Sequence, residues 1–191
     1  DQMIDEDGST GALSFTLGDS ETAVDDLIIG VASSNTALVP NANVVLSGSG
    51  ANRTVVVTPV ADRSGTTTVS ITVSDGSLST TSSFDVVVND INDAPYLIGQ
   101  IGDVTLPESF APVRINLAGF FRDIESSSIA LSAGSSNAGL VSASMDGNDL
   151  LLESVAGGAG TSMVSVTATD QGGAATTVPF IVTVGSTSTL V

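Results

Sequence analysis

The chain contains two copies of one pattern, and this repetition constrains its fold more than any other feature. Residues 33–39 (SSNTALV) match residues 135–141 (SSNAGLV), and residues 65–75 (GTTTVSITVSD) match residues 160–170 (GTSMVSVTATD). The order is kept, but the second copy is a few residues shorter between the two matches, which predicts a shorter hairpin there. Copies of roughly 95 residues have the size of small domains.

The repeat predicts two tandem domains, residues 1–93 and 94–191. Asp1 aligns with Asp103, so we expect the first copy to begin inside a repeat, with its N-terminal strand truncated, as in a fragment of a longer protein. Each domain is long enough to bury a small core. That core must be aliphatic, because the chain has no Trp, one Tyr and six Phe.

Short, β-branched segments with alternating apolar and polar residues predict an all-β fold. Residues 68–73 and 164–168 alternate at every step, as expected of strands with one face buried. Turn residues recur about every 8–12 residues, as in a β-sandwich. We therefore expect two antiparallel Greek-key sandwiches of about seven strands each, with Ile71 and Val166 in equivalent environments. The expected strands are 13–17, 27–32, 43–46, 54–58, 66–74, 83–89, 113–117, 129–133, 140–145, 150–153, 162–169 and 176–184.

Composition excludes several classes of function. Without Cys, His or Lys, the chain cannot build a thiol nucleophile, a Ser-His-Asp triad, a thiolate or imidazole zinc site, a Schiff base or a Walker-type phosphate loop. A formal net charge of −17 argues against nucleic-acid binding, which needs clustered basic residues. We also expect no membrane insertion, because no stretch approaches about 20 apolar residues. The same charge favours bound or screening cations.

The linker and several acidic motifs resemble those of cadherin repeats. Residues 90–95 (DINDAP) resemble the cadherin linker D-x-N-D-N-A-P with one Asn missing. Other motifs resemble the conserved positions within a repeat: LPE at 106–108, IDE at 4–6, DIE at 123–125 and TATDQG at 167–172. The chain as a whole is similar to the cadherin-like and Ig-like tandem repeats of large bacterial surface adhesins. This resemblance implies an extracellular or cell-surface location.

The resemblance also implies interdomain Ca²⁺, an ion that prefers six to eight oxygen ligands. The implied ligands are Glu6, Asp62, Asn92, Asp93, Asp123, Glu125 and Asp170. A weaker second set at the free end of the first domain is Asp19, Glu21 and Asp75. The motifs depart from the family at Ser64, where Glu is expected, and at the missing Asn. The alternative is that these carboxylates only solvate the ends of loops.

These observations favour a non-catalytic spacer or stalk of an adhesin-like protein, with its domains end to end and neighbouring repeats as partners. The alternative is a calcium-dependent module that binds carbohydrate or a surface protein. Sugar binding usually needs exposed aromatic rings, and the only Tyr is Tyr96, in the linker. Asp123 and Glu125 have the chemistry of a glycosidase pair, but they lie two residues apart on an expected loop without an aromatic platform. We therefore expect no enzyme.

Overall fold

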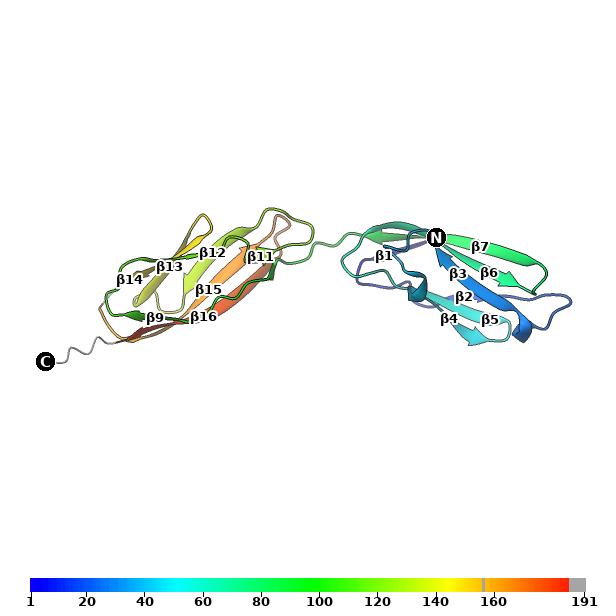
Figure 1. Ribbon diagram of the computed structural model, residues 1–191, viewed down its shortest axis with the longest axis horizontal. Coiled ribbons are helices and arrows are strands. Elements are labelled where there is room, and N and C mark those ends of the chain that lie inside the picture. The colour runs from blue at the N-terminus through cyan, green and yellow to red at the C-terminus, as the bar shows by residue number, and fades with distance from the viewer. Residues whose placement is uncertain (156, 186–191) are drawn as a thin grey trace. The chain divides into compact units, whose positions relative to one another are not determined.

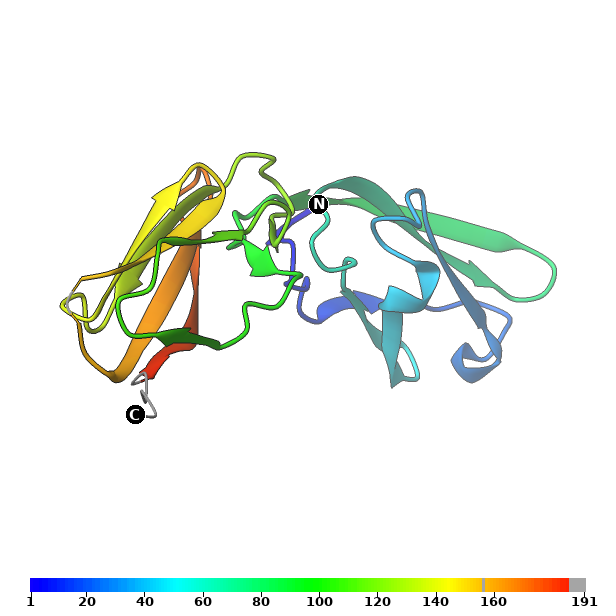
Figure 2. The same cartoon turned by 60° about the vertical axis from the view of Figure 1, so that its left-hand side comes forward.

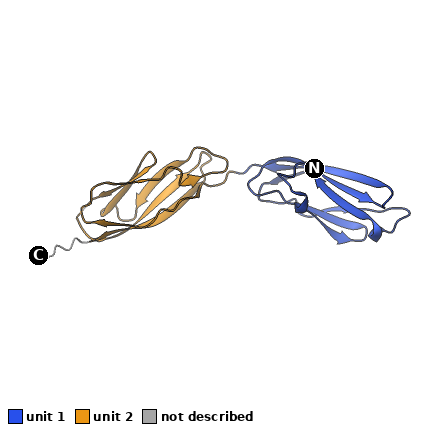
Figure 3. Ribbon diagram, viewed as in Figure 1, with its two compact units in different colours: residues 1–91 blue, residues 92–191 orange. Residues whose placement is uncertain are grey.

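The computed structural model describes residues 1–155 and 157–185, and this part of the chain is almost entirely strand and loop (Figure 1). It forms two compact units, Asp1–Ile91 and Asn92–Val191 (Figure 3). The helical segments of the described residues are two short 3₁₀ turns, η1 (Val24–Asp26) and η2 (Asn41–Asn43). Neither of these turns has the length or the hydropathy that crossing a membrane requires. The predicted all-β fold is confirmed.

Unit 1 is a sandwich of two sheets with strand orders β1-β7-β6-β3 and β2-β5-β4. In Figure 2 the green strands of the first sheet and the cyan strands of the second lie on opposite sides of this unit. The sheets enclose an aliphatic core in which Val39, Val57, Val69 and Val86 are fully buried. The strands are β1 (Gln2–Asp5), β2 (Leu13–Thr16), β3 (Ile28–Ser33), β4 (Val44–Ser49), β5 (Asn52–Val57), β6 (Gly65–Ser74) and β7 (Ser79–Asn89).

Unit 2 has the same two sheets and adds two short strands. Its sheets have the orders β9-β16-β15-β12 and β10-β14-β13, and an additional ladder joins β8 to β11. The strands are β8 (Tyr96–Leu97), β9 (Val104–Pro107), β10 (Val113–Asn116), β11 (Phe121–Arg122), β12 (Ala130–Ser135), β13 (Val141–Asp146), β14 (Asp149–Ser154), β15 (Gly160–Thr169) and β16 (Ala175–Gly185). The two copies in the sequence therefore correspond to two units with the same strand order in their main sheets.

Alternation along the central strands places the same positions in both cores. Every second residue of β6 and β15 faces inward, and Ile71 and Val166 are 9% and 0% exposed. Burying a side chain of this size contributes about 1.5–3 kcal/mol. The prediction that these two residues share one environment is confirmed.

The repeated SSN motif stabilises the end of β3 and of β12. In unit 1 the buried hydroxyl of Thr67 lies 2.8 Å from the Ser33 hydroxyl and accepts the N–H of Asn35 at 3.1 Å. In unit 2 the buried hydroxyl of Ser162 makes the equivalent contacts, with the same distances. A buried hydroxyl must be paired to avoid a desolvation cost, so the motif has a structural role in each unit.

Two details differ from the sequence-based expectations. Neither sandwich is purely antiparallel, because β1 pairs in parallel with β7 and β9 pairs in parallel with β16, the last strand of each unit. The predicted short hairpin was also wrong. Ser49 pairs with Asn52 and Asp146 with Asp149, so the two turns have equal length.

The difference in length between the copies lies in the connections instead. The connection from Leu38 to Val44, which includes η2, is five residues longer than the connection in unit 2, where β13 follows directly after Leu140. The connection 58–64 is also longer than the connection 155–159. Both insertions are solvent-side connections, where added residues cost little.

Candidate metal site

One end of unit 2 gathers five of the predicted ligands from three segments of the chain. Asn92 and Asp93 begin the unit, Asp123 and Glu125 follow β11, and Asp170 follows β15. The Asn92 amide donates a hydrogen bond of 2.8 Å to Asp170 Oδ2. The Asp93 N–H donates to Glu125 Oε2 at 3.1 Å. The three segments are therefore held together through the side chains that the sequence singled out.

Asp123 organises its own loop with one carboxylate oxygen and leaves the other without a partner. Its Oδ1 accepts the N–H groups of Glu125 at 3.1 Å and Ser126 at 2.6 Å. Its Oδ2 is buried and has no hydrogen-bond partner among the described residues. A buried carboxylate oxygen without a donor is costly unless a cation or a water compensates it.

Asp170 is the most buried of these ligands, with 7% of its surface exposed. Its Oδ1 accepts the N–H groups of Gly173 at 2.6 Å and Ala174 at 2.9 Å. Burial acts to raise the pKa of Asp170, but the hydrogen bonds from Asn92 and from these backbone groups outweigh it and lower the pKa. The carboxylate is therefore ionised at neutral pH.

Gly172 makes the contact between Asn92 and Asp170 possible. A Cβ on Gly172 would overlap the end of the Asn92 side chain, so any other residue there would have to displace Asn92. The close approach of Asn92 therefore explains why the TATDQG motif has a Gly at this position. Sequence reasoning quoted this Gly only as part of the family motif.

The site is strongly negative and lacks basic partners. In the described part of unit 2, the ion pairs join Arg114 to Asp146 at 2.8 Å and to Asp149 at 3.5 Å, on the β10–β14–β13 sheet. Among those residues, Asp123, Glu125 and Asp170 form no ion pair with a basic side chain. Such a cluster suits a hard divalent cation.

Unit 1 repeats this arrangement in the weaker predicted set. Asp19 Oδ1 accepts the N–H groups of Glu21 at 2.9 Å and Thr22 at 2.8 Å, as Asp123 does in unit 2. Asp19 and Asp75 line one small cavity. The predicted set is therefore partly brought together.

Asp75 closes its loop in the same way as Asp170. Its Oδ1 accepts the N–H groups of Ser77 at 2.7 Å and Leu78 at 2.6 Å. These bonds, that from Leu78 first, lower the pKa of Asp75. In both units, an ionised aspartate closes its loop by accepting two backbone N–H groups.

The other predicted ligands, Glu6 and Asp62, lie in unit 1. Glu6 follows β1 and is 2% exposed, and its Oε1 accepts the N–H of Ile91 at 2.7 Å. Asp62 has a left-handed backbone, with φ of 57°, and its N–H donates to Asp7 Oδ1 at 3.4 Å. Sequence reasoning omitted Asp7 as a ligand, although it stands directly after the IDE motif.

Ser64, which departs from the family pattern, contacts Asp90, which matches it. The Ser64 hydroxyl donates to Asp90 Oδ1 at 3.0 Å. Ser64 stands where the cadherin motif has a Glu, so at this position unit 1 supplies a hydrogen-bond donor in place of a carboxylate. Asp90 was quoted in the linker motif but not among the ligands; its acidic side chain beside the linker was the available signal.

Comparisons with known proteins give structural similarity at low identity. No family model and no curated protein matches the sequence. The chain is similar to cadherin repeats EC1–2 of human protocadherin-24, with 18% identity, a TM-score of 0.49, and coverage of 97% of this chain and 95% of that one. It is similar to titin domains Z1Z2, crystallised with telethonin, at 15% identity and a TM-score of 0.39, covering 97% and 92%.

An endo-fucoidan hydrolase of glycoside hydrolase family 107 is also similar, at 19% identity and a TM-score of 0.39. The match covers 97% of this chain but spans only 27% of the hydrolase. At these scores, the assignment of a two-sheet sandwich rests on the strand pairing described above. Cadherin and Ig-like domains are among the proteins that this chain resembles.

Proposed function

We propose that this chain is a pair of non-catalytic, extracellular β-sandwich repeats that space an adhesin-like bacterial surface or secreted protein. The observation that carries the proposal is the repeated unit itself. The same strand order, the same buried hydroxyl contacts and the same loops closed by an aspartate occur in both units. Repeats of this kind extend a chain in steps and need no active site. The neighbouring repeats are the expected partners.

The same proposal includes Ca²⁺ at the acidic end of unit 2. The amide oxygen of Asn92 and carboxylates of Asp93, Asp123, Glu125 and Asp170 offer the oxygen ligands that this ion prefers. The unpartnered Oδ2 of Asp123 supports the proposal most directly, because a cation would compensate its burial. That Glu6 and Asp62 complete the ligand set remains a prediction from the sequence.

A module that binds carbohydrate through stacking is less well supported. The chain has no Trp, and its single Tyr, Tyr96, is 45% exposed at the start of unit 2. One ring is a small platform for a sugar. Asp123 and Glu125 belong to a single turn, closed by the bond from the Glu125 N–H to Asp123 Oδ1, which favours a structural role for both.

Calorimetric titration of the whole chain with Ca²⁺ tests the metal site. Extracellular modules bind with dissociation constants of about 10⁻⁴–10⁻³ M, and we expect this range. Asp123→Asn should abolish most of the binding heat, since it removes the charge of the buried oxygen. Glu153→Gln, an exposed acid on β14, is the matched control and should bind normally. Absence of Ca²⁺ binding, or equal loss in both variants, would reject the site.

A further inference from the structure

The outer strand β3 of unit 1 has a free edge. It pairs with β6 on one side, and no strand of the described chain pairs with its other side. The Ser34 N–H donates to a β6 carbonyl at 2.9 Å, whereas the Ser33 N–H donates away from β6, to Asn41 Oδ1 at 2.8 Å. Because these directions alternate along an antiparallel strand, the N–H and C=O groups of Ile29 and Val31 also point to the free edge.

This edge is limited at both ends. At one end the N–H of Leu27 is bonded to η1, and at the other the side chain of Asn41 occupies the N–H of Ser33. Within the part of the chain that the structure describes, no hydrogen bond reaches the N–H groups of the two outward residues between them. These two residues stand one on each side of Gly30. The open part of the edge is therefore symmetric about Gly30.

The sequence of β3 has none of the usual features that protect a strand edge. Natural edges carry Lys, Pro, a bulge or an inward-pointing charge, which prevents pairing with another chain. β3 (IIGVAS) pairs with β6 without a bulge, and residues 27–52 contain no charged side chain. Beside the open edge, Ile28 is 65% exposed. In a chain with a net charge of −17, this uncharged edge is well suited to pairing with another strand.

The equivalent edge of unit 2 is less accessible. β12 lies close to β13 of the opposite sheet, whereas β3 and β4 lie further apart. The residue in the place of Ile28 is Ala130, because Ile28 pairs with Ser74 and Ala130 with the equivalent Thr169. Unit 2 therefore has neither the open edge nor the exposed Ile, and it offers matched control positions.

We infer that the free edge of β3 pairs in an antiparallel manner with the same edge of a second copy of this chain, about a two-fold axis at Gly30. In this register Ile29 of one copy lies opposite Val31 of the other, and each such pair exchanges two hydrogen bonds. No other antiparallel register uses both outward residues of both copies. The four-stranded sheet of unit 1 then continues into that of the second copy, in an interface that is the same on both sides.

The side chains and the charges favour a second copy as the occupant of this edge. In the proposed register Ile28 lies opposite Ala32 of the second copy, on the outer face of the sheet, so the exposed Ile is covered. Asp25 and Asp26 directly precede β3. Antiparallel pairing places them beside the uncharged SSN motif of the second copy, whereas parallel pairing would bring the acidic residues of both copies together.

Sedimentation velocity of the whole chain tests this inference. EDTA is present, so that the proposed Ca²⁺ site does not contribute. The contact is small, and we expect a dissociation constant of about 0.1–1 mM. Association should be stronger in about 0.5 M than in about 0.05 M NaCl, because salt screens the repulsion between two chains of charge −17. A chain that stays monomeric at about 1 mM in high salt would overturn the choice of a second copy.

Two matched variants locate the contact. At Gly30 and at Gly134 on β12, an added Cβ meets nothing within 4 Å, so both positions accept a side chain. Gly30→Glu places two carboxylates opposite each other across the axis and should leave a monomer at every concentration. Gly134→Glu adds the same charge to unit 2 and should dimerise nearly as well as the parent chain. Dimerisation that survives Gly30→Glu, or that both variants lose equally, would overturn the inference.

Disulfide crosslinking locates the axis without adding charge. The chain has no Cys, so one introduced thiol reports one position. Gly30→Cys places two thiols directly opposite each other, with Cα atoms about 4.5–5.5 Å apart, as a disulfide requires. Ala32→Cys places them four residues apart along the strands, which is out of reach. Under mild oxidation Gly30→Cys should form a covalent dimer about 10-fold faster than Ala32→Cys or Gly134→Cys. Equal rates would overturn the inference.

Discussion

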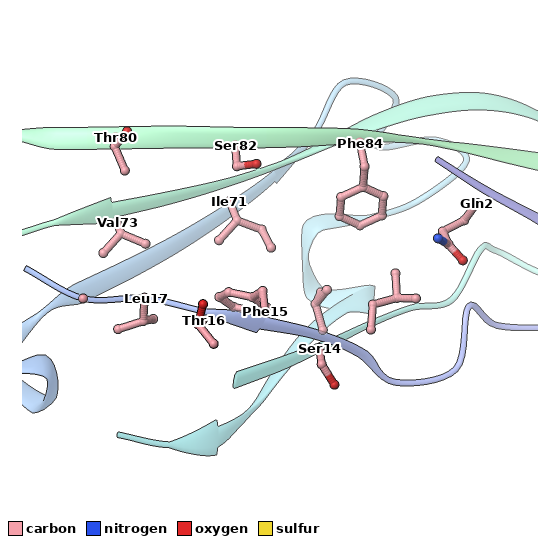
Figure 4. Close-up of a pocket in the computed structure, with 13 residues that line it drawn as sticks. Gln2, Ser14, Phe15, Thr16, Leu17, Ile71, Val73, Thr80, Ser82 and Phe84 are labelled. Carbon is pink, nitrogen blue, oxygen red and sulfur yellow. The ribbon is translucent and has the colours of Figure 1, made fainter. Parts of the chain in front are cut away.

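The two units have one topology but differ in how well the edge beside β2 and β10 is closed. Unit 2 covers this edge with β8 and β11, and its Phe180 is 4% exposed. In unit 1 only Gly18 stands between Leu17 and Asp19, where unit 2 has residues 118–122, and Phe84 lines an open cavity (Figure 4). The difference teaches that the central strands determine the topology, while completeness of the core depends on short peripheral segments.

Truncation of the two equivalent Phe residues should give the largest contrast between the units. Phe180→Ala should destabilise unit 2 by about 3–5 kcal/mol, since it leaves a void in a closed core. Phe84→Ala should cost unit 1 clearly less, because its side chain already borders an open cavity. Denaturant unfolding of the whole chain measures both. Equal losses would show that the two cores are equally complete.

Removal of the equivalent buried hydroxyls should destabilise the two units by similar amounts. Ser162→Ala and Thr67→Val should each cost about 1–3 kcal/mol, because the N–H groups of Asn137 and Asn35 lose their acceptor. Thermal unfolding of each variant measures the loss. If only one of the two variants loses stability, the two SSN motifs do not have the same structural role.

Gly172→Ala should affect the acidic end of unit 2 selectively. The added Cβ displaces Asn92 from Asp170, so Ca²⁺ binding should weaken with only a small loss of stability. Gly134→Ala, where an added Cβ meets nothing within 4 Å, is the control and should change neither property. Calorimetry with Ca²⁺ separates the two variants. Unchanged affinity in Gly172→Ala would remove Asn92 from the ligand set.

Arg114→Gln should give the smallest effect. Its ion pairs with Asp146 and Asp149 are exposed, and unit 1 has Ser14 at the equivalent position without such a pair. Exposed ion pairs contribute little in water. The melting temperature should stay within experimental error at moderate salt. A marked decrease would mean that the two units differ in electrostatics as well as in packing.

The sequence predicts the central strands well, because alternation from 65 to 74 and from 160 to 169 reflects burial directly. It does not predict β1 and β9, because four residues carry too short a pattern and their parallel pairing depends on a distant partner. The lengths of the hairpins were misassigned because glycines at 48 and 50 suggest a longer turn, although only Gly50 and Ala51 lie between the paired ends.

The sequence motifs predicted which acidic residues gather at the end of each unit, but they did not predict the geometry of these residues. That Asp123 uses one oxygen for its loop and keeps the other buried depends on three segments meeting in space. Nor does the pattern of any one strand reveal the cavity of unit 1. Phe84 and Leu17 line this cavity, whereas Leu97 and Ile101 pack against the core cluster that contains their unit 2 equivalents.

The parallel pairing of β1 with β7 has a mechanical consequence. The two strands run in the same direction, so tension applied to the ends of unit 1 pulls Gln2 backward and Asn89 forward along the ladder. The hydrogen bonds between them are then loaded in shear, and they must rupture together rather than one after another as in an unzipping hairpin. Unit 2 has the same geometry between β9 and β16. Each unit is therefore built to resist stretching along its own chain.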